Sequence, residues 1–115
     1  MTGLSLVHGL YEGSHITSRN YNIDVRVDKF VSTNPVGSDL SVKLTIKGLG
    51  NPRVIFLTGQ GDSYVVHVPG DIKITLMPSN PLNEGQVRLN YQAPPDYHID
   101  RTSFRKRNKN HQKHF

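Results

Sequence analysis

Apolar and polar residues alternate with a period of two along much of this chain, and the alternation limits what it can fold into. The pattern is clearest in segments 23–28, 40–47, 72–77 and 87–92. Period-two alternation is typical of a strand with one buried face. Apolar residues nowhere recur at helical spacing for more than about two turns. The sequence therefore predicts an all-β chain of roughly eight or nine short strands.

The charge of the chain is unevenly distributed. The net charge is +5, yet residues 101–115 contain no Asp or Glu. The rest of the chain, residues 1–100, holds eight basic and nine acidic residues, a net charge of −1. A cationic arm of this kind indicates either an anionic partner, nucleic acid first, or a solvated tail that only aids solubility. Its basic residues are Arg101, Arg105, Lys106, Arg107, Lys109 and Lys113.

Several kinds of function find no support in the sequence. The chain has no Cys, no apolar run long enough to cross a membrane and no signal peptide, so we expect a cytoplasmic protein without membrane contact. Its six His residues include no pair at zinc-like spacing with partners. There is no Gly-x-Ser-x-Gly motif and no Gly-rich loop that enters a helix. We therefore expect no enzyme activity, no metal and no cofactor.

The two halves of the chain resemble each other. Each contains an alternating strand, an Asn-Pro-hydrophobic turn and a second strand, which predicts an internal duplication with pseudo-equivalent hairpins at 23–46 and 72–91. The alternative is that two polar hairpins use similar turns by chance, because Asn-Pro is a common turn pair. The duplication divides the chain into repeats 1–52 and 53–104 and a basic tail, 105–115. The candidate first strands of the repeats are 4–7 and 55–58.

About a third of the chain resembles the carbon storage regulator (Csr/Rsm) family, the small RNA-binding proteins that repress translation. The resemblance rests on the order and spacing of four segments rather than on any single motif. These segments are Gly70-Asp71-Ile72-Lys73-Ile74-Thr75, Gly85-Gln86-Val87-Arg88-Leu89, Ala93-Pro94 and Ile99-Asp100-Arg101.

The resemblance implies a fold. Members of the family are homodimers in which five-stranded protomers exchange strands, and the first strand of one protomer lies beside the last strand of the other. Two copies in one chain imply a strand-swapped β-sandwich or barrel that closes as a pseudo-dimer, with a disordered basic C-terminal arm from Arg105. Segment 53–58 is the only candidate for both the last strand of the first repeat and the first strand of the second. The two ends of the pseudo-dimer are therefore expected to differ.

The resemblance also implies a function, the recognition of GGA-containing loops in messenger RNA leaders. We expect a single RNA site where 4–8 lies beside 97–101, because this end keeps Leu6, Ile99 and Arg101 and the cationic arm begins there. The other end has one strand serving for two. Both repeats lack the family's first-strand arginines, which are replaced by His8 and Gly9 in one and by Gly59 and Gln60 in the other. A protein-interaction module or decoy that pairs with a host Csr regulator is the alternative, and a component of a larger phage or secretion assembly is a third. Either a monomeric pseudo-dimer or a weak homodimer is expected. The predicted RNA-binding residues are Leu6, His8, Tyr97, Ile99, Arg101, Arg105, Lys106 and Arg107.

Overall fold

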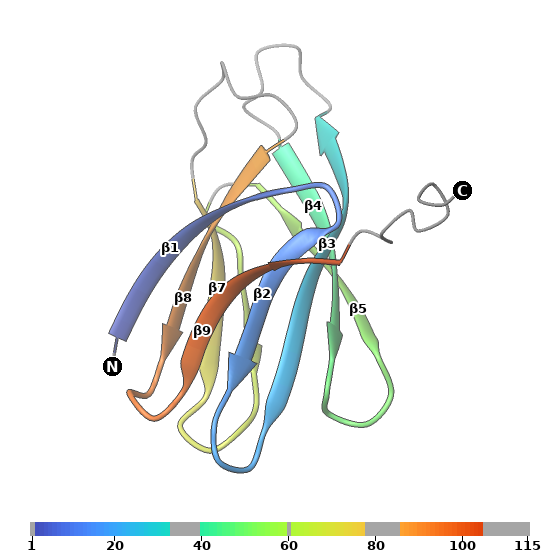
Figure 1. Cartoon of the computed structure of the whole chain (residues 1–115). Helices are drawn as coiled ribbons and strands as arrows, with labels where there is room; N and C mark the ends of the chain where they lie inside the picture. The colour runs from blue at the N-terminus through green and yellow to red at the C-terminus, as the bar shows by residue number, and fades with distance from the viewer. Residues whose placement is uncertain (1, 33–39, 60, 78–85, 105–115) are drawn as a thin grey trace, which may run out of the picture.

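A computed structural model of the chain describes residues 2–32, 40–59, 61–77 and 86–104, and its regular elements in these ranges are all β-strands. The all-β prediction is therefore confirmed (Figure 1). The strands are β1 (Thr2–Gly9), β2 (Glu12–Thr17), β3 (Asn22–Ser32), β4 (Leu40–Lys47), β5 (Arg53–Thr58), β6 (Ser63–Val66), β7 (Ile72–Met77), β8 (Gln86–Ala93) and β9 (His98–Ser103).

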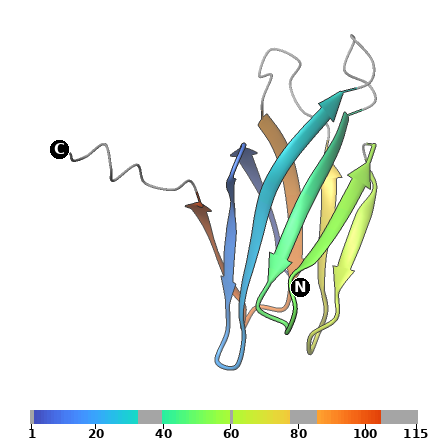
Figure 2. The ribbon, with the colours of Figure 1, turned by 90° about the vertical axis from the view of Figure 1, so that its right-hand side faces the viewer.

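The strands form two antiparallel sheets that pack against each other. One sheet has four strands in the order β1-β8-β7-β6, and the other has five in the order β5-β4-β3-β2-β9. In Figure 2, β5 and β6 lie together at one side of the molecule, and β1 and β9 lie toward the other. The apolar residues predicted by the alternation fill the space between the sheets. The core includes Ile23, Val25, Val27, Val42, Leu44 and Ile46 of the five-stranded sheet and Ile72, Ile74, Leu76, Val87, Leu89 and Tyr91 of the four-stranded sheet.

Both predicted hairpins form antiparallel pairs. Strand β3 pairs with β4 and places Val27 opposite Leu44, while β7 pairs with β8 and places Leu76 opposite Leu89. These four residues are all buried. The Asn-Pro-hydrophobic turns of the prediction lie outside the described residues. The pairing of the two hairpins is thus as the sequence indicated.

The pairing pattern of one sheet is repeated in the other. Strands β2-β3-β4 and β6-β7-β8 each form a meander of neighbouring antiparallel strands. The last strand of each meander then pairs with the strand that precedes the other meander, β4 with β5 and β8 with β1. Strand β9 adds to the outer side of β2, and no strand in the described part of the chain takes the matching place beside β6. The two sheets differ by this one strand.

The sequence did not indicate β2. The structure places Gly13, Ser14 and Ile16 within β2, in a part of the chain that lacks the alternating pattern. A Cβ atom on Gly13 would lie 1.7 Å from the carbonyl oxygen of Val25, so this glycine allows close contact with β3 rather than a bend. Small and polar buried residues do not produce an alternating apolar pattern, which explains why this strand was not recognised.

Candidate nucleic-acid interface

The predicted site lies where edge strands β1 and β9 come to the same side of the sandwich (Figures 1 and 2). The expectation that segment 4–8 lies beside 97–101 needs correction, because β1 hydrogen-bonds with β8 and β9 hydrogen-bonds with β2. The unexpected strand β2 provides the pairing edge for β9, which therefore joins the five-stranded sheet. β1 and β9 are therefore edge strands of opposite sheets on the same side of the sandwich.

Strand β1 contributes apolar residues to this side of the sandwich. Leu6 lies opposite Leu89 of β8, is half-buried and packs against the core. Leu4, two residues earlier on the same side, keeps 37% of its surface exposed. Because alternate residues of a strand share a face, Leu4 and Leu6 form a partly open apolar surface along the edge of β1.

Strand β9 contributes an apolar residue and a charge. Ile99 lies opposite Ile16 of β2 and packs partly against the core. Arg101 shares this face and is exposed. Its positive charge helps to lower the pKa of His8 on β1, so the Arg101 guanidinium acts electrostatically on the neighbouring edge strand.

The intervening residues of β9 point the other way. The Nε2 atom of His98 lies 3.1 Å from Oδ1 of Asp100, and both side chains are largely exposed. This exposed pair lies on the outer face of the sheet.

His8 of β1 belongs to a buried polar cluster. Its Nε2 atom is 3.0 Å from the Tyr91 hydroxyl oxygen and 3.2 Å from the Ser14 hydroxyl oxygen. Burial, and to a smaller extent Arg101, lowers the pKa of His8 to about 4, against a smaller opposing effect of Glu12. His8 is therefore neutral near pH 7, and its Nδ1 atom has no hydrogen-bond partner among the described residues. A side chain with no exposed surface supports the site from below and does not itself reach a ligand.

Tyr97 is also enclosed. It keeps 8% of its surface exposed, and its hydroxyl donates a hydrogen bond to the carbonyl oxygen of Pro69 at 3.0 Å. Its ring packs in the core and offers no free face on which a base could stack. The structure thus places half-buried Leu6 and Ile99 and exposed Arg101 on two edge strands at the same side of the sandwich, with His8 buried nearby, and leaves Tyr97 apart. Arg105, Lys106 and Arg107 lie outside the described residues.

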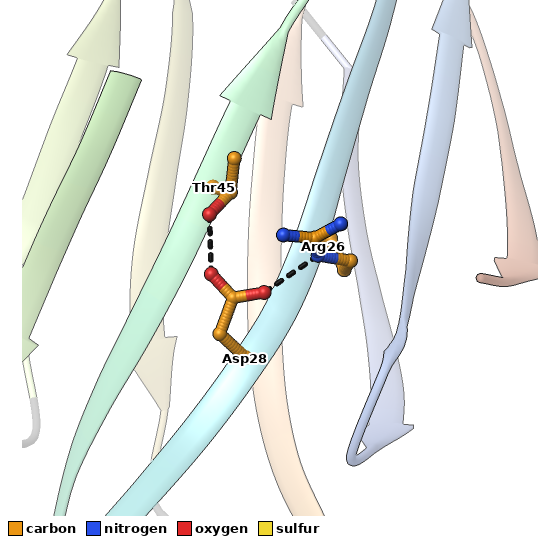
Figure 3. Close-up of polar contacts among 3 residues, drawn as sticks. All are labelled: Arg26, Asp28 and Thr45. Carbon is orange, nitrogen blue, oxygen red and sulfur yellow. Dashed lines mark hydrogen bonds and ion pairs between the residues drawn. The ribbon is translucent and has the colours of Figure 1, made fainter. Parts of the chain in front are cut away.

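A polar cluster on β3 that the sequence did not indicate stabilises a bulge in this strand. The pairing of β3 with β4 shifts between Val27 and Lys29, so Asp28 is the extra residue. Its carboxylate accepts hydrogen bonds from Nε of Arg26, at 2.6 Å, and from the hydroxyl of Thr45 (Figure 3). The consecutive polar residues Asp28 and Lys29, which interrupt the alternation, are the signal by which the bulge could have been found.

The bulge is connected to the candidate site through backbone hydrogen bonds. The carbonyl oxygen of Val27 accepts from the amide of Tyr11 at 2.7 Å, and the carbonyl oxygen of Tyr11 accepts from the amide of Phe104 at 2.7 Å. Tyr11 lies in the turn between β1 and β2 and has a φ angle of 62°. These contacts fix the end of β9 against that turn, and so help to position Arg101 relative to β1.

The site as a whole presents an exposed guanidinium next to an apolar strip. Within the described ranges, no group of three or more His, Cys, Asp or Glu residues is arranged to hold a metal ion. The same ranges contain no helix that could span a membrane. Comparison of the chain with protein-family models, curated proteins and solved structures gives no significant match.

Proposed function

We propose that the protein is an RNA-binding translational regulator of the Csr/Rsm type, with one RNA site on the side formed by β1 and β9. The observation that carries the proposal is the position of Arg101 and Ile99 on the last strand, on the same side as Leu6 of the first. Guanidinium groups contact phosphates and base edges, and apolar side chains offer surface to unstacked bases. Single-stranded loops of RNA present such bases, so a GGA-containing loop in a messenger leader is a fitting ligand.

The strand pairing supports the proposal of a covalent pseudo-dimer. In the resembled family, protomers exchange strands, and here β1 pairs with β8 while β5 pairs with β4, so each half of the chain completes the sheet of the other. Two of the resembling segments also touch, since a Cβ atom on Gly70 would lie 2.3 Å from Cγ of Pro94. A sandwich closed within one chain needs no concentration-dependent assembly step before it can bind RNA.

The difference between the two sides supports one site rather than two. In the described part of the chain, β6 has no neighbour that would correspond to β9, and Gly59 stands where the family has an arginine. The site at β1 and β9 also lies where the chain continues into the basic tail 105–115. Cationic residues there would add phosphate contacts without reading bases, and such contacts make affinity strongly dependent on salt.

The direct test measures binding of a labelled GGA hairpin to the full chain by fluorescence anisotropy. A hairpin with the same stem and a scrambled loop is the matched control, and both are measured over a range of salt concentrations. We expect one RNA per chain and clearly weaker binding of the scrambled loop. Two equal sites per chain, or equal affinity for the two loops, would contradict the proposal. Removal of residues 105–115 should lower the affinity for both RNAs equally and reduce the dependence of affinity on salt concentration.

A protein-interaction module of the same fold is the second candidate. It is favoured by the loss of the family's first-strand arginines. His8, at one of these positions, is buried and packs inside the protein instead of being available to RNA. Such a protein would retain the strand pairing but not the RNA contacts. Absence of RNA binding even at low salt, in a chain shown to be folded by circular dichroism, would favour this candidate over the first.

A further inference from the structure

The side of the sandwich away from β1 and β9 ends in β5, an edge strand with apolar residues on both faces. Ile55 and Leu57 point toward the interior, whereas Val54 and Phe56 point outward with 54% and 58% of their surfaces exposed. No other large apolar side chain in the described residues is as exposed. The only charged residue of the strand is Arg53, at its first position. Edge strands normally carry charges, prolines or bulges that prevent pairing with another chain, and β5 has little of this protection.

The other three sheet edges are less suited to pairing. β9 carries His98, Asp100 and Arg101 within six residues, and β6 is only four residues long. β1 is uncharged, but Gly3 and Ser5 on its outer side offer little apolar surface to a partner, and Val7 on the same side is half-buried. The apolar edge is therefore a specific property of β5.

The backbone of β5 has groups available for pairing on its open side. The amide of Thr58 donates to Oδ2 of Asp62 at 2.9 Å, a bond that an amide directed at β4 would not make. Backbone groups of an antiparallel strand point alternately to its two sides. Val54 and Phe56, which are in phase with Thr58, therefore also present their N–H and C=O groups to the open side, where a partner strand could satisfy them.

We propose that β5 is a self-association edge, at which two copies of this chain pair as antiparallel strands about a two-fold axis. In the register that places Ile55 opposite Ile55 of the partner subunit, Val54 lies opposite the partner's Phe56. The two outer pairs then form one apolar cluster across the junction, and the residues with free backbone groups face each other. The same strand pairs with itself, as an isologous interface requires.

Charges at the ends of β5 favour a second copy as the occupant. Arg53 begins the strand, and the carboxylate of Asp62 is held at its end by the amide of Thr58. Antiparallel pairing brings Arg53 of each copy to the end where the partner's Asp62 lies, so opposite charges meet twice. In this register Thr58, whose amide already has a partner, lies opposite the partner's Pro52, which has no N–H to offer. The strand is thus complementary to itself in apolar surface, hydrogen bonding and charge.

This interface lies away from β1 and β9, so each copy would keep its candidate RNA site free. Two sites held in one dimer could bind two loops of the same messenger, and the second binding step would then be intramolecular. Self-association through β5 does not depend on the proposed RNA function and can be tested without RNA.

Sedimentation equilibrium of the full chain at increasing protein concentration tests the proposal. We expect a reversible monomer–dimer equilibrium that is lost in Phe56→Lys and in Val54→Lys, because a charge would enter the apolar cluster at an exposed position that tolerates it in the monomer. Tyr11→Lys is the matched control, since Tyr11 is an exposed aromatic residue on the other side of the molecule and its replacement should leave the dimer intact. Circular dichroism of each variant checks that it is folded. A monomer at all concentrations, or a dimer that persists in folded Phe56→Lys and Val54→Lys, would overturn the proposal.

Cysteine cross-linking tests the register. The chain contains no Cys, so a single introduced thiol can pair only with its own copy. Residues directly opposite in antiparallel strands have Cα atoms about 4.5–5.5 Å apart, within disulfide range. We expect Ile55→Cys to form the cross-linked dimer faster than either Val54→Cys or Phe56→Cys. Equal or slower cross-linking at position 55 would overturn this register.

Discussion

The two sides of the sandwich are built from corresponding strands but contain different chemistry. Strand β1 pairs with β8 as β5 pairs with β4, and the registers make His8 the counterpart of Leu57 and Tyr91 the counterpart of Ile46. All four side chains are buried. One side thus holds a hydrogen-bonded polar cluster at the place where the other holds only apolar packing.

This difference shows how a repeated architecture can acquire two different edges. On the polar side, β9 adds a strand that carries Arg101 near His8, and Leu4 of β1 is partly exposed. On the apolar side, no described strand lies beyond β6, and β5 exposes Val54 and Phe56. We propose that the first edge binds an anionic ligand and that the second pairs with another strand. The predictions that follow test this contrast, beginning with the largest expected effect.

Leu57→Ala should have the largest effect on stability. Its side chain keeps 1% of its surface exposed, so truncation leaves a cavity in the core and should lower the free energy of unfolding by roughly 2–5 kcal/mol. Denaturation by urea at neutral pH measures this change. Leu4→Ala on the other side is the matched control and should cost clearly less, because much of Leu4 is already exposed. Equal losses for the two variants would show that the apolar side is not the better packed one.

The stability of the polar side should depend on pH through His8. Its pKa is about 4 in the folded protein and 6.5 in the unfolded chain. Both states are neutral above pH 6.5, and between these values only the unfolded chain binds the proton, so the free energy of unfolding falls as pH decreases. The loss should reach about 3 kcal/mol near pH 4. Urea denaturation at a series of pH values checks this prediction.

His8→Leu places on the polar side the same residue type that Leu57 provides on the apolar side. It should remove the loss of unfolding free energy that His8 causes at low pH. His98→Ala, which replaces an exposed histidine of β9, should leave it unchanged. A pH profile that is the same in the parent and in His8→Leu would contradict the assignment of the titration to His8.

Arg101→Ala should weaken binding of a GGA hairpin by roughly 1–3 kcal/mol, because it removes a charge-assisted contact at the proposed site. Anisotropy titration provides the measurement. The matched control is Arg19→Ala, which removes an exposed arginine between β2 and β3 and should have little effect. Similar losses in both variants would mean that only overall charge matters.

Tyr91→Phe should have the smallest effect. The change removes the hydroxyl that lies 3.0 Å from Nε2 of His8 but keeps the ring in the core, so we expect a loss of about 1 kcal/mol in the free energy of unfolding. Thermal or urea denaturation at neutral pH measures it. A more stable Tyr91→Phe variant would mean that the buried cluster costs more than it contributes.

The alternation in the sequence correctly predicted the strands whose apolar residues all lie on one face, including those of both hairpins. It could not predict β2, in which Gly13 and Ser14 are buried without being large or apolar. The pairing of β9 was wrong for the same reason, since its neighbour had not been recognised. Burial of a small residue depends on how closely two strands approach, which is a tertiary property.

The comparison of first strands shows a second limit. The sequence match related Leu6 to Leu57, whereas the pairing registers relate Leu6 to Ile55 and Leu57 to His8. A shift of two residues keeps every side chain on its own face, so a period-two pattern cannot detect it. Tyr97 shows a third limit, because its hydroxyl bonds to Pro69, which no local pattern could indicate. Of the candidate site, the roles of Leu6, Ile99 and Arg101 stay predictions, whereas the burial of His8 and Tyr97 depends on tertiary contacts that the sequence pattern does not contain.

The pairing of β1 with β8 has a consequence for folding during synthesis on the ribosome. Strand β1 hydrogen-bonds with β8, and the six strands that lie between them in the sequence must be synthesised before β1 can join its sheet. Until then, the inward-facing side chains of β2, β3 and β4 lack the opposing layer that covers them in the finished protein. Contacts so distant along the chain are made slowly. The nascent protein therefore spends its synthesis with exposed apolar strands, the condition under which chaperones are most needed.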